Sequence, residues 1–462
     1  MSETREETKG KLNSIGSGFC AAKWTQVTMH LHNGLTHSCH HPTPHKIPLS
    51  EIETNPTALH NTMHKKLNRK GMLDGKRPTE CSYCWKIEDN STIYSDRILK
   101  SDEPWSKPFI DEIVEKKWDD DYNPKYVEVS FSNTCNFKCS YCGPMFSSKW
   151  VEEIERFGPY KDSNYFNSIE WLGKNNTMPF KHSEHNPYVE SFWKWWPNLY
   201  KDLHTFRITG GEPLLSKDTW KVLDYILDEE TPNKNLNFSI NSNLGVPDDL
   251  IDRLIEKLKK IIEEDRVNEI ILFTSIDGYG KQSEYIRHGL NNDKFWNNIE
   301  KILESIPQIT ITIMSTYNIL SPFSYNDLIK KVYDLKIKYS NEKRYWQHPI
   351  LLDTSYLNHP THMSVKLLNE EHKKLVLNNA ETALFYSVSV FDNKHMGLTE
   401  IEVGKIKRIY DWLISDDFKF NIYNERKCFV NFVDEHDKRR NTNFLETFPE
   451  LQNFYTEIKN DI

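Results

Sequence analysis

The sequence has no long apolar segment. Its mean hydropathy is −0.69, and nothing in its 462 residues approaches the roughly 20 consecutive apolar residues that cross a bilayer. The first dozen residues, MSETREETKGKL, also lack the apolar stretch of a secretory signal. These absences exclude a membrane-spanning protein and predict one without a membrane partner that works in the cytoplasm.

An excess of basic residues is missing as well. Lys and Arg number 59 against 67 Asp and Glu, which gives a formal charge of −8. Proteins that bind the phosphate backbone usually carry a basic excess or stripe, so nucleic acid is disfavoured as a partner. There is no internal repeat and no low-complexity tract, and the length predicts two or three domains.

Cysteine is scarce outside the first third of the chain. Seven of the eight cysteines lie between positions 20 and 142, and Cys428 is the exception. In a cytoplasmic protein, clustered cysteines are more often metal ligands than disulfides. We expect Cys428 to be a buried structural thiol, with a redox role or a place near a cluster as the alternative.

The N-terminal part divides into two segments. Residues 1–17 are expected to form a polar tail. Residues 18–105 are rich in His, Asn and Pro and predict a small, loop-rich α+β unit that needs a metal to hold it together. Within it, the run 24–32 followed by Asn33-Gly34 predicts a β-hairpin, and residues 59–72 are compatible with a helix.

Residues 124–352 show short β-rich runs that alternate with helical stretches. Such alternation predicts a parallel sheet covered by helices, and the fold class is therefore α/β with an incomplete barrel. The strands are expected at 127–131, 205–209, 237–241, 270–276 and 309–314, with a sixth near 346–352, and the helices at 219–227, 248–263 and 295–303.

Two further segments depart from this alternation. The first crossover, 145–196, is long and aromatic and predicts an insertion. Its Trp193, Trp195 and Trp196 are expected in a core or cap rather than in a substrate site. Residues 353–462 are charged and predict a mostly helical C-terminal region.

Three cysteines stand close together directly after the first predicted strand. The run C-N-F-K-C-S-Y-C places Cys135, Cys139 and Cys142 at spacings of three and two residues. A cubane iron–sulfur cluster normally has four thiolate ligands, so three would leave one iron open for catalysis. Tyr141 is expected to shield the cluster. A zinc knuckle or a group of buried thiols is the alternative interpretation of the spacing alone.

The glycine-rich sequence Gly210-Gly211-Glu212-Pro213 follows the second predicted strand. Together with the CxxxCxxC loop it resembles the radical S-adenosylmethionine (radical SAM) superfamily over roughly residues 124–352. The resemblance implies a partial (β/α)6 barrel and a [4Fe–4S] cluster on Cys135, Cys139 and Cys142. It also implies that the open iron binds S-adenosylmethionine, which is cleaved reductively to a 5′-deoxyadenosyl radical that abstracts hydrogen from a substrate.

The resemblance also assigns residues to the cofactor. Main-chain carbonyls of the glycine-rich segment would bind the methionine amino group, while Glu212 either contributes its carboxylate or braces the loop. Arg287, ten residues after Asp277, would bind the cofactor carboxylate, since arginine suits bidentate carboxylate recognition. Capping turns and a surface arginine are the alternatives. The implied cofactor-binding residues are Tyr141, Thr209, Gly210, Gly211, Glu212, Pro213, Ser239, Asn241, Ser275, Asp277 and Arg287.

Four more cysteines lie in the N-terminal unit. This series is similar to the twitch and SPASM auxiliary-cluster domains. It consists of Cys20, Cys39, Cys81 and Cys84, followed by Trp85, Glu88 and Ser95-Asp96-Arg97. Four thiolates saturate a second [4Fe–4S] cluster, and the short, one-cluster twitch form fits the count better. Such domains usually follow the barrel, whereas here the unit precedes it. A structural zinc site, enlarged by nearby histidines, is the alternative.

Three functions compete. Relatives with auxiliary clusters often modify a peptide or protein side chain, and this hypothesis is slightly favoured. The second hypothesis is radical chemistry on a sugar, nucleoside or other small metabolite. A non-catalytic, zinc-stapled binding protein is the third and is disfavoured by the intact motifs. An enzyme of this family would also need a flavodoxin- or ferredoxin-type electron donor. The sequence does not identify the substrate, the bond that is changed, the role of the auxiliary cluster or the oligomeric state.

Overall fold

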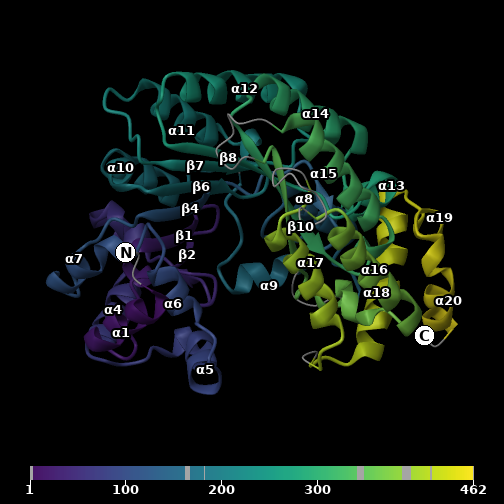
Figure 1. The fold of residues 1–462 in the computed structure, drawn as a ribbon, viewed down its shortest axis with the longest axis horizontal. Helices are drawn as coiled ribbons and strands as arrows, with labels where there is room; N and C mark the ends of the chain where they lie inside the picture. Colours follow the sequence, from purple (N-terminus) through teal and green to yellow (C-terminus); the bar gives the residue numbers. More distant parts are fainter. Residues whose placement is uncertain are drawn as a thin grey trace.

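A nine-stranded sheet forms the centre of the protein (Figure 1). The computed structural model describes residues 4–161, 167–181, 183–340, 348–387, 397–416 and 419–460. The strand order is β11-β10-β8-β7-β6-β4-β1-β2-β3, and all neighbours from β11 to β1 are parallel. The strands are β1 (Gln26–His30), β2 (Leu35–His37), β3 (His45–Lys46), β4 (Tyr126–Ser130), β6 (Thr205–Thr209), β7 (Asn237–Asn241), β8 (Glu269–Ser275), β10 (Thr310–Tyr317) and β11 (Ile350–Tyr356).

Six of these strands, from β4 to β11, are the predicted half-barrel in chain order. The fold class is therefore confirmed. The sixth strand begins later than expected, at Ile350, and runs to Tyr356, so the sheet continues past the expected boundary at residue 352. Positions 346 and 347 of the expected range lie outside the described residues.

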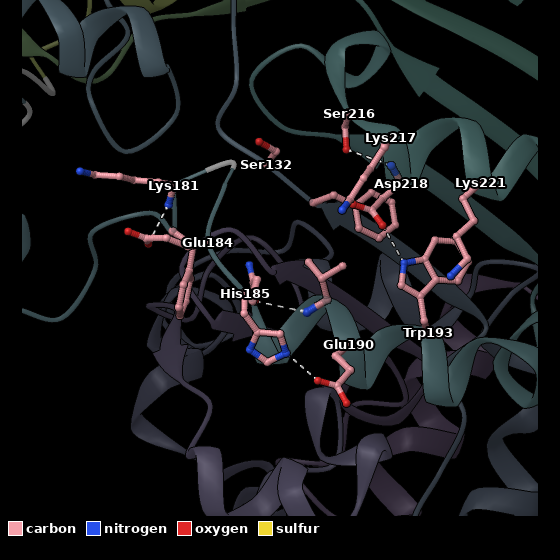
Figure 2. A pocket seen from close by; sticks show the side chains of 14 residues that line it. Ser132, Lys181, Glu184, His185, Glu190, Trp193, Ser216, Lys217, Asp218 and Lys221 are labelled. Carbon is pink, nitrogen blue, oxygen red and sulfur yellow. Dashed lines mark hydrogen bonds and ion pairs between the residues drawn. The ribbon is translucent and has the colours of Figure 1, made fainter.

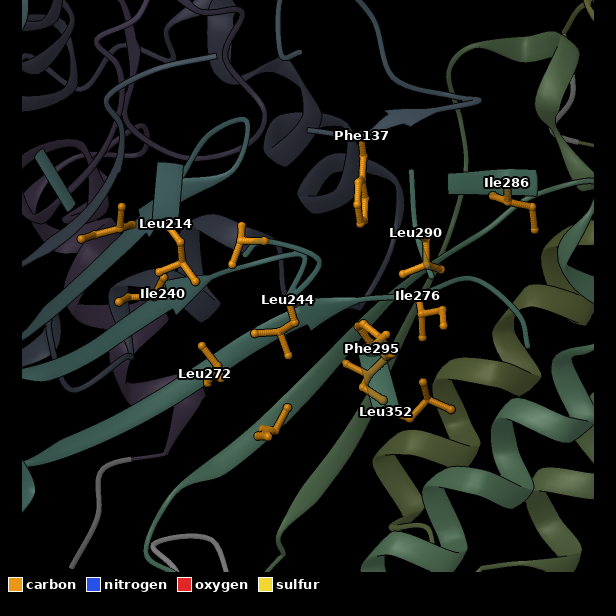
Figure 3. Close-up of a cluster of buried hydrophobic side chains, with 14 of the residues drawn as sticks. Phe137, Leu214, Ile240, Leu244, Leu272, Ile276, Ile286, Leu290, Phe295 and Leu352 are labelled. Atoms are coloured by element: carbon orange, nitrogen blue, oxygen red, sulfur yellow. The ribbon is translucent and has the colours of Figure 1, made fainter. Parts of the chain in front are cut away.

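Alternate residues of the parallel strands point into a layer of helices. Val129, Ile208, Ile240 and Leu272 are paired across β4, β6, β7 and β8, and each is at most 1% exposed. Figure 3 shows Ile240 and Leu272 within this core. The covering helices are α10 (Pro187–Asp202), α11 (Lys217–Asp228), α12 (Asp248–Glu263), α14 (Asn292–Ser305) and α15 (Tyr325–Tyr339).

The N-terminal unit is built onto the same sheet. The predicted hairpin is confirmed, because β1 and β2 pair antiparallel around Gly34, whose φ is +68°. β1 also pairs in parallel with β4, so the unit extends the half-barrel instead of standing apart from it. Its helices are α2 (Ala22–Thr25), α3 (Leu49–Thr54), α4 (Met63–Leu73), α5 (Ser82–Asn90), α6 (Asp96–Ser101) and α7 (Ile110–Glu115).

The expected polar tail is wrong. Helix α1 (Arg5–Ile15) begins at a capping box, in which the Thr4 side chain and Glu7 bond to each other's backbone N–H. Leu12 of this helix is fully buried against Phe19 and Trp24. One buried leucine and one buried threonine in eleven residues leave too weak a periodic signal to mark the helix in the sequence.

The remaining helices lie in the long crossover, directly after β8 and after the sheet. In Figure 1 the C-terminal helices gather on the side of the half-barrel away from the N-terminal unit. They confirm the helical C-terminal region. Among the described residues, no helix combines the length and the apolar character needed to cross a membrane. These helices are α8 (Ser148–Phe157), α9 (Ile169–Lys174), α13 (Gly280–Ile286), α16 (Glu370–Phe385), α17 (Glu400–Leu413), α18 (Ile422–Arg440), α19 (Phe444–Thr447) and α20 (Gln452–Asn460).

Candidate active site

The three closely spaced cysteines lie on the loop that follows β4. Their thiols are near one another: burial is the main cause that raises the pKa of Cys135, to about 12, and the Cys139 thiol adds to it. For Cys142, burial and then the Cys139 and Cys135 thiols raise the pKa. The loop therefore presents three neighbouring thiols, the kind and number of donor that a cubane cluster with one open iron requires.

Phe137 anchors this loop in the core. Its side chain is 1% exposed, and Figure 3 shows it pointing toward the sheet. A Cβ at Gly245 would lie 2.3 Å from the Phe137 ring, and a Cβ at Gly289, where φ is +110°, would lie 2.9 Å from it. Two glycines are therefore needed to make room for the ring that holds the cysteines in place.

Three donors from outside the loop bind its backbone carbonyls. Ser147 Oγ donates to Phe137 O at 2.8 Å, Trp150 Nε1 to Cys139 O at 3.0 Å, and Arg440 Nη1 to Lys138 O at 2.6 Å. The loop is thus fixed by helix α8 and by the last residue of α18, about three hundred residues away in the sequence.

Arg440 is a site residue that the sequence did not reveal. Its guanidinium binds both oxygens of Glu153 at 3.1 Å, and both side chains are at most 1% exposed. Burial alone would raise the pKa of Glu153, but the charge of Arg440 and its hydrogen bonds hold that pKa at about 2. In the sequence Arg440 is one of three adjacent basic residues on a charged helix, and nothing there distinguishes it from a solvent-exposed arginine.

The glycine pair after β6 packs against the base of the cysteine loop. A Cβ at Gly211 would lie 2.4 Å from Thr134 O, and Glu212 N donates to the same carbonyl at 2.7 Å. Gly210 has φ +137° and closely approaches Ser132 O. In this structure the glycines let one loop backbone approach another, which explains why both positions lack a side chain.

Glu212 braces the loop onto the end of β7. Its carboxylate accepts from Leu214 N at 3.0 Å, Ser242 Oγ at 2.8 Å and Asn243 N at 2.6 Å. Burial raises its pKa to about 7, against the effect of these hydrogen bonds. Of the two roles expected for Glu212, this geometry shows the bracing one. Pro213 begins the short turn that follows and is buried.

Asp277, Arg287 and Tyr141 form a buried polar cluster beside the cysteine loop. The Arg287 fork binds Asp277 through Nε at 2.8 Å and Nη2 at 3.1 Å, and Tyr141 Oη donates to Asp277 at 2.7 Å. Asp277 is 0% and Arg287 7% exposed. The surface-arginine alternative is therefore wrong, and the fork expected for the cofactor carboxylate is occupied by Asp277.

The concave face of the half-barrel is polar. Arg207 lies at its centre, where Nε donates to Asn241 Oδ1 at 2.9 Å and the guanidinium covers the Phe273 ring at 4.1 Å. Glu128 is 4.0 Å from the guanidinium. In the sequence, Glu128 and Arg207 are charged residues within two β-rich runs, and this feature could have identified them. Ser239 and Ser275, expected near the ribose, lie on β7 and at the end of β8, and Thr209 ends β6.

Two cavities open near the loop. One of about 310 Å³ is lined by Tyr141 and Cys142 and, across from them, by Trp171 and His359. The other, of about 630 Å³, lies beyond Ser132, between the insertion and the start of α11 (Figure 2). The predicted core role holds for Trp195 and Trp196, which are at most 2% exposed, whereas Trp193 lines this second cavity.

The four N-terminal cysteines line one shared cavity, together with Trp85 and Arg97. Burial raises the pKa of Cys39 to about 11 and of Cys81 and Cys84 to about 12, with the neighbouring thiols adding to it. Arg97 binds Glu88 at 2.8 Å and Phe19 O at 3.0 Å, which fixes one wall. Cys20 is also in this group. Cys428 lies on α18 and is partly exposed, so the expectation of a buried thiol is wrong at this position.

Comparisons with known proteins agree with the geometry of the central domain. Residues 129–320, less than half of the chain, match the family model of the radical SAM superfamily. No curated protein matches the chain. Two solved structures are similar at 14% identity: native anSMEcpe with bound AdoMet (TM-score 0.35) and Streptococcus suis SuiB bound to the precursor peptide SuiA (TM-score 0.34).

The extent of these matches differs. The first covers 58% of this chain and 61% of the anSMEcpe chain, so this chain spans less than two thirds of that structure. The second covers 88% of this chain and 79% of SuiB. The matched segment contains the cysteine loop and the glycine pair, so the central domain is similar to the radical SAM superfamily at the residues that form the candidate site.

Proposed function

We propose that the protein is an enzyme that cleaves S-adenosylmethionine reductively at a [4Fe–4S] cluster on Cys135, Cys139 and Cys142. When bound, this pair of cofactors supplies a 5′-deoxyadenosyl radical that abstracts hydrogen from the substrate. The observation that carries the proposal is the rigid loop with three neighbouring thiols. It is supported by the cavity of about 310 Å³ that reaches Cys142, where a cofactor has room to approach.

The ends of the parallel strands supply the proposed cofactor contacts. Backbone carbonyls of residues 209–213 would accept from the methionine amino group. The side chains of Ser239, Asn241 and Ser275 would face the ribose. Supporting this, the strands that carry these residues are parallel neighbours, so their carboxyl ends lie at one edge of the sheet with the cysteine loop.

For the N-terminal unit we propose a second, auxiliary [4Fe–4S] cluster on Cys20, Cys39, Cys81 and Cys84. The four thiols line one shared cavity, so the chain brings the four possible ligands to one place. Four thiolates are enough to saturate a cubane cluster. All eight thiols are free, which fits a reducing cytoplasm and a flavodoxin- or ferredoxin-type donor.

The substrate we propose is a peptide or protein side chain flanked by acidic residues. The cavity of about 630 Å³ is lined by Lys181, Lys217 and Lys221, and in the described part of the chain none of these three ammonium groups has an acidic partner. The carboxylates beside them are already bonded: Asp218 accepts from Trp193 Nε1 at 2.8 Å, and Glu190 binds Lys194 at 2.6 Å. Figure 2 shows Asp218 bonded to Trp193 and Glu190 bonded to His185. A third carboxylate, Glu184, also lines the cavity. We propose that the three lysines, which have no acidic partner in the described part of the chain, contact acidic residues of an extended chain.

The chemistry is tested by replacing Cys135, Cys139 and Cys142 together with Ala. Anaerobically reconstituted wild type should form 5′-deoxyadenosine under dithionite, and the triple variant should form none while keeping about four irons. Continued cleavage of S-adenosylmethionine in the triple variant contradicts the proposal.

The substrate class is tested separately with Lys217→Ala/Lys221→Ala. This variant should still cleave S-adenosylmethionine without substrate, but should show a raised KM for peptides with acidic residues. Lys234→Ala, at an exposed ion pair on another surface, is the matched control. Equal turnover of acidic and neutral peptides by wild type rejects the preference for acidic residues, and turnover of a small metabolite alone rejects the peptide proposal.

A further inference from the structure

A short two-stranded ladder brings Arg287 to one of the three cysteines. β5 (Lys138–Cys139) pairs antiparallel with β9 (Arg287–His288), and Cys139 is directly opposite Arg287. Ser140 N also donates to Ile286 O at 2.8 Å, which extends the pairing by one residue. The backbone register therefore fixes the distance between the two side chains.

The guanidinium faces the sulfur. Arg287 Nη1 lies 3.7 Å from Cys139 Sγ and donates toward it. The other two nitrogens are turned away: Nε and Nη2 bind the two oxygens of Asp277, and Nη2 also donates to Tyr141 Oη at 2.5 Å. One edge of the fork is thus occupied, and of the three nitrogens only Nη1 is directed at a cysteine of the loop.

Asp277 holds the arginine in this position. Its Oδ1 also accepts from Thr316 N on β10 at 2.8 Å, and its Oδ2 accepts from Tyr141 Oη. Because Asp277 is completely buried, moving Arg287 away would leave an uncompensated charge in the core, which is strongly unfavourable. The Asp277 carboxylate, Tyr141 and Cys139 also raise the pKa of Arg287 well above its ordinary value, although burial acts against the charge.

The geometry points to Arg287 as a positioning residue that acts on the cluster through Cys139 and raises its reduction potential. This inference rests on the proposed function. A hydrogen bond and a positive charge at a cluster sulfur favour the reduced, more negative state, and both are recognised determinants of cluster potential. Asp277 carries the opposite charge at a greater remove from the sulfur, so the two residues act on the potential with opposite signs.

The opposite signs provide the test. Wild type, Arg287→Ala, Arg287→Lys and Asp277→Asn are reconstituted anaerobically, without S-adenosylmethionine or substrate. Their midpoint potentials are measured by titration monitored by electron paramagnetic resonance. The signal to follow is the one that is missing from the triple-cysteine variant. Lys294→Ala, at an exposed ion pair with Asp248, is the control.

We expect the potential to become more negative in Arg287→Ala and to shift less far in the same direction in Arg287→Lys, which keeps the charge but loses the fork. Asp277→Asn should shift it to more positive values, and Lys294→Ala should leave it unchanged. Iron content should match wild type, since no ligand is altered. If Arg287→Ala fails to fold, Arg287→Lys and Asp277→Asn still carry the prediction of opposite signs.

Two outcomes overturn the inference. If the potentials are unchanged, or shift in the same direction in all three variants, Arg287 and Asp277 only support the structure of the loop. Calorimetry could also show that Arg287→Ala binds S-adenosylmethionine more weakly while its potential is unchanged. Arg287 would then be a ligand of the cofactor carboxylate. Failure of the proposed function gives a different result, because wild type would then lack the signal that distinguishes it from the triple-cysteine variant.

Discussion

The two cysteine sites are built in opposite ways. The three-cysteine site has all its ligands within eight residues, 135–142, but its supports come from distant segments, such as Trp150, Gly245 and Arg440. The four-cysteine site has ligands spread from Cys20 to Cys84, but its supports lie in the same stretch of chain. A compact motif can therefore depend on the whole protein, while a dispersed one depends on a single small unit.

This contrast predicts how damage spreads. Changes in the C-terminal helices should reach the three-cysteine site, because α18 ends on its backbone. Changes in α1, α5 or α6 should remain within the four-cysteine site. The following variants test both expectations.

The largest effect is expected from removing the dispersed ligands. Replacing Cys20, Cys39, Cys81 and Cys84 with Ala should lower the bound iron from about eight to about four per chain, since each cubane holds four. Formation of 5′-deoxyadenosine without substrate should continue, because the loop at 135–142 keeps its supports. Iron and zinc analysis is the measurement. About four irons with one zinc in wild type would support the zinc alternative.

Arg440→Ala should affect the compact site from a distance. The change removes the bidentate partner of the buried Glu153, which keeps only Lys138 and Tyr160, and it removes a donor from Lys138 O. Breaking a buried pair costs up to about 3–5 kcal/mol, so the free energy of unfolding should fall by up to that amount. The cluster proposed on Cys135, Cys139 and Cys142 should be lost faster under chelation. Lys459→Ala, at an exposed pair with Asp434, is the control and should change stability by about 0–1 kcal/mol. Equal effects of the two variants would mean that α18 does not support the loop.

Leu12→Ala tests whether helix α1 belongs to the four-cysteine unit. Leu12 packs in the buried cluster that contains Cys81, Cys84 and Trp85, and truncating a buried leucine costs about 2–5 kcal/mol. Denaturant unfolding should show this loss, with weaker iron retention at the four-cysteine site only. Lys9→Ala, on the same helix but more exposed, is the control. If Leu12→Ala leaves the free energy of unfolding unchanged, residues 1–17 behave as the polar tail expected from the sequence.

The smallest effect is expected at Glu212, and it depends on pH. Glu212→Gln replaces one accepting oxygen with an amide that faces the Asn243 N–H, a loss of about 1–3 kcal/mol. Since the pKa of Glu212 is raised from 4.5 to about 7, the folded state holds a proton that the unfolded state has released in this window. The free energy of unfolding of wild type should therefore fall as pH rises from about 5 to 7.

The glutamine variant lacks this titration, so its difference from wild type should shrink over the same pH range. Thermal unfolding of both proteins at pH 5, 6, 7 and 8 makes the comparison. A difference that grows with pH would show that the three donors outweigh burial and keep Glu212 ionised.

The sequence predicted what is local and periodic. Strands β4 to β11, the hairpin at Asn33-Gly34 and the three-cysteine loop each leave a signal within a few residues, and the family model supports the central domain. The sequence did not show which distant side chains contact one another in the folded protein. Asp277 and Arg287 were both singled out, yet their mutual pairing depends on the β5–β9 ladder, and Arg440 depends on the packing of a helix three hundred residues later. The burial of Leu12 is likewise a tertiary property.

The parallel pairing of β1 with β4 has a consequence for synthesis on the ribosome. A hundred residues separate the two strands, and Leu31 N donates to Ser130 O where they meet. Until residues 126–130 emerge, β1 has an open edge on that side, and loop closure over such a distance is slow. The N-terminal unit therefore cannot finish folding ahead of the half-barrel, even though all its cysteines are already outside. The four thiols of this unit are therefore already synthesised while the sheet beside them is still incomplete.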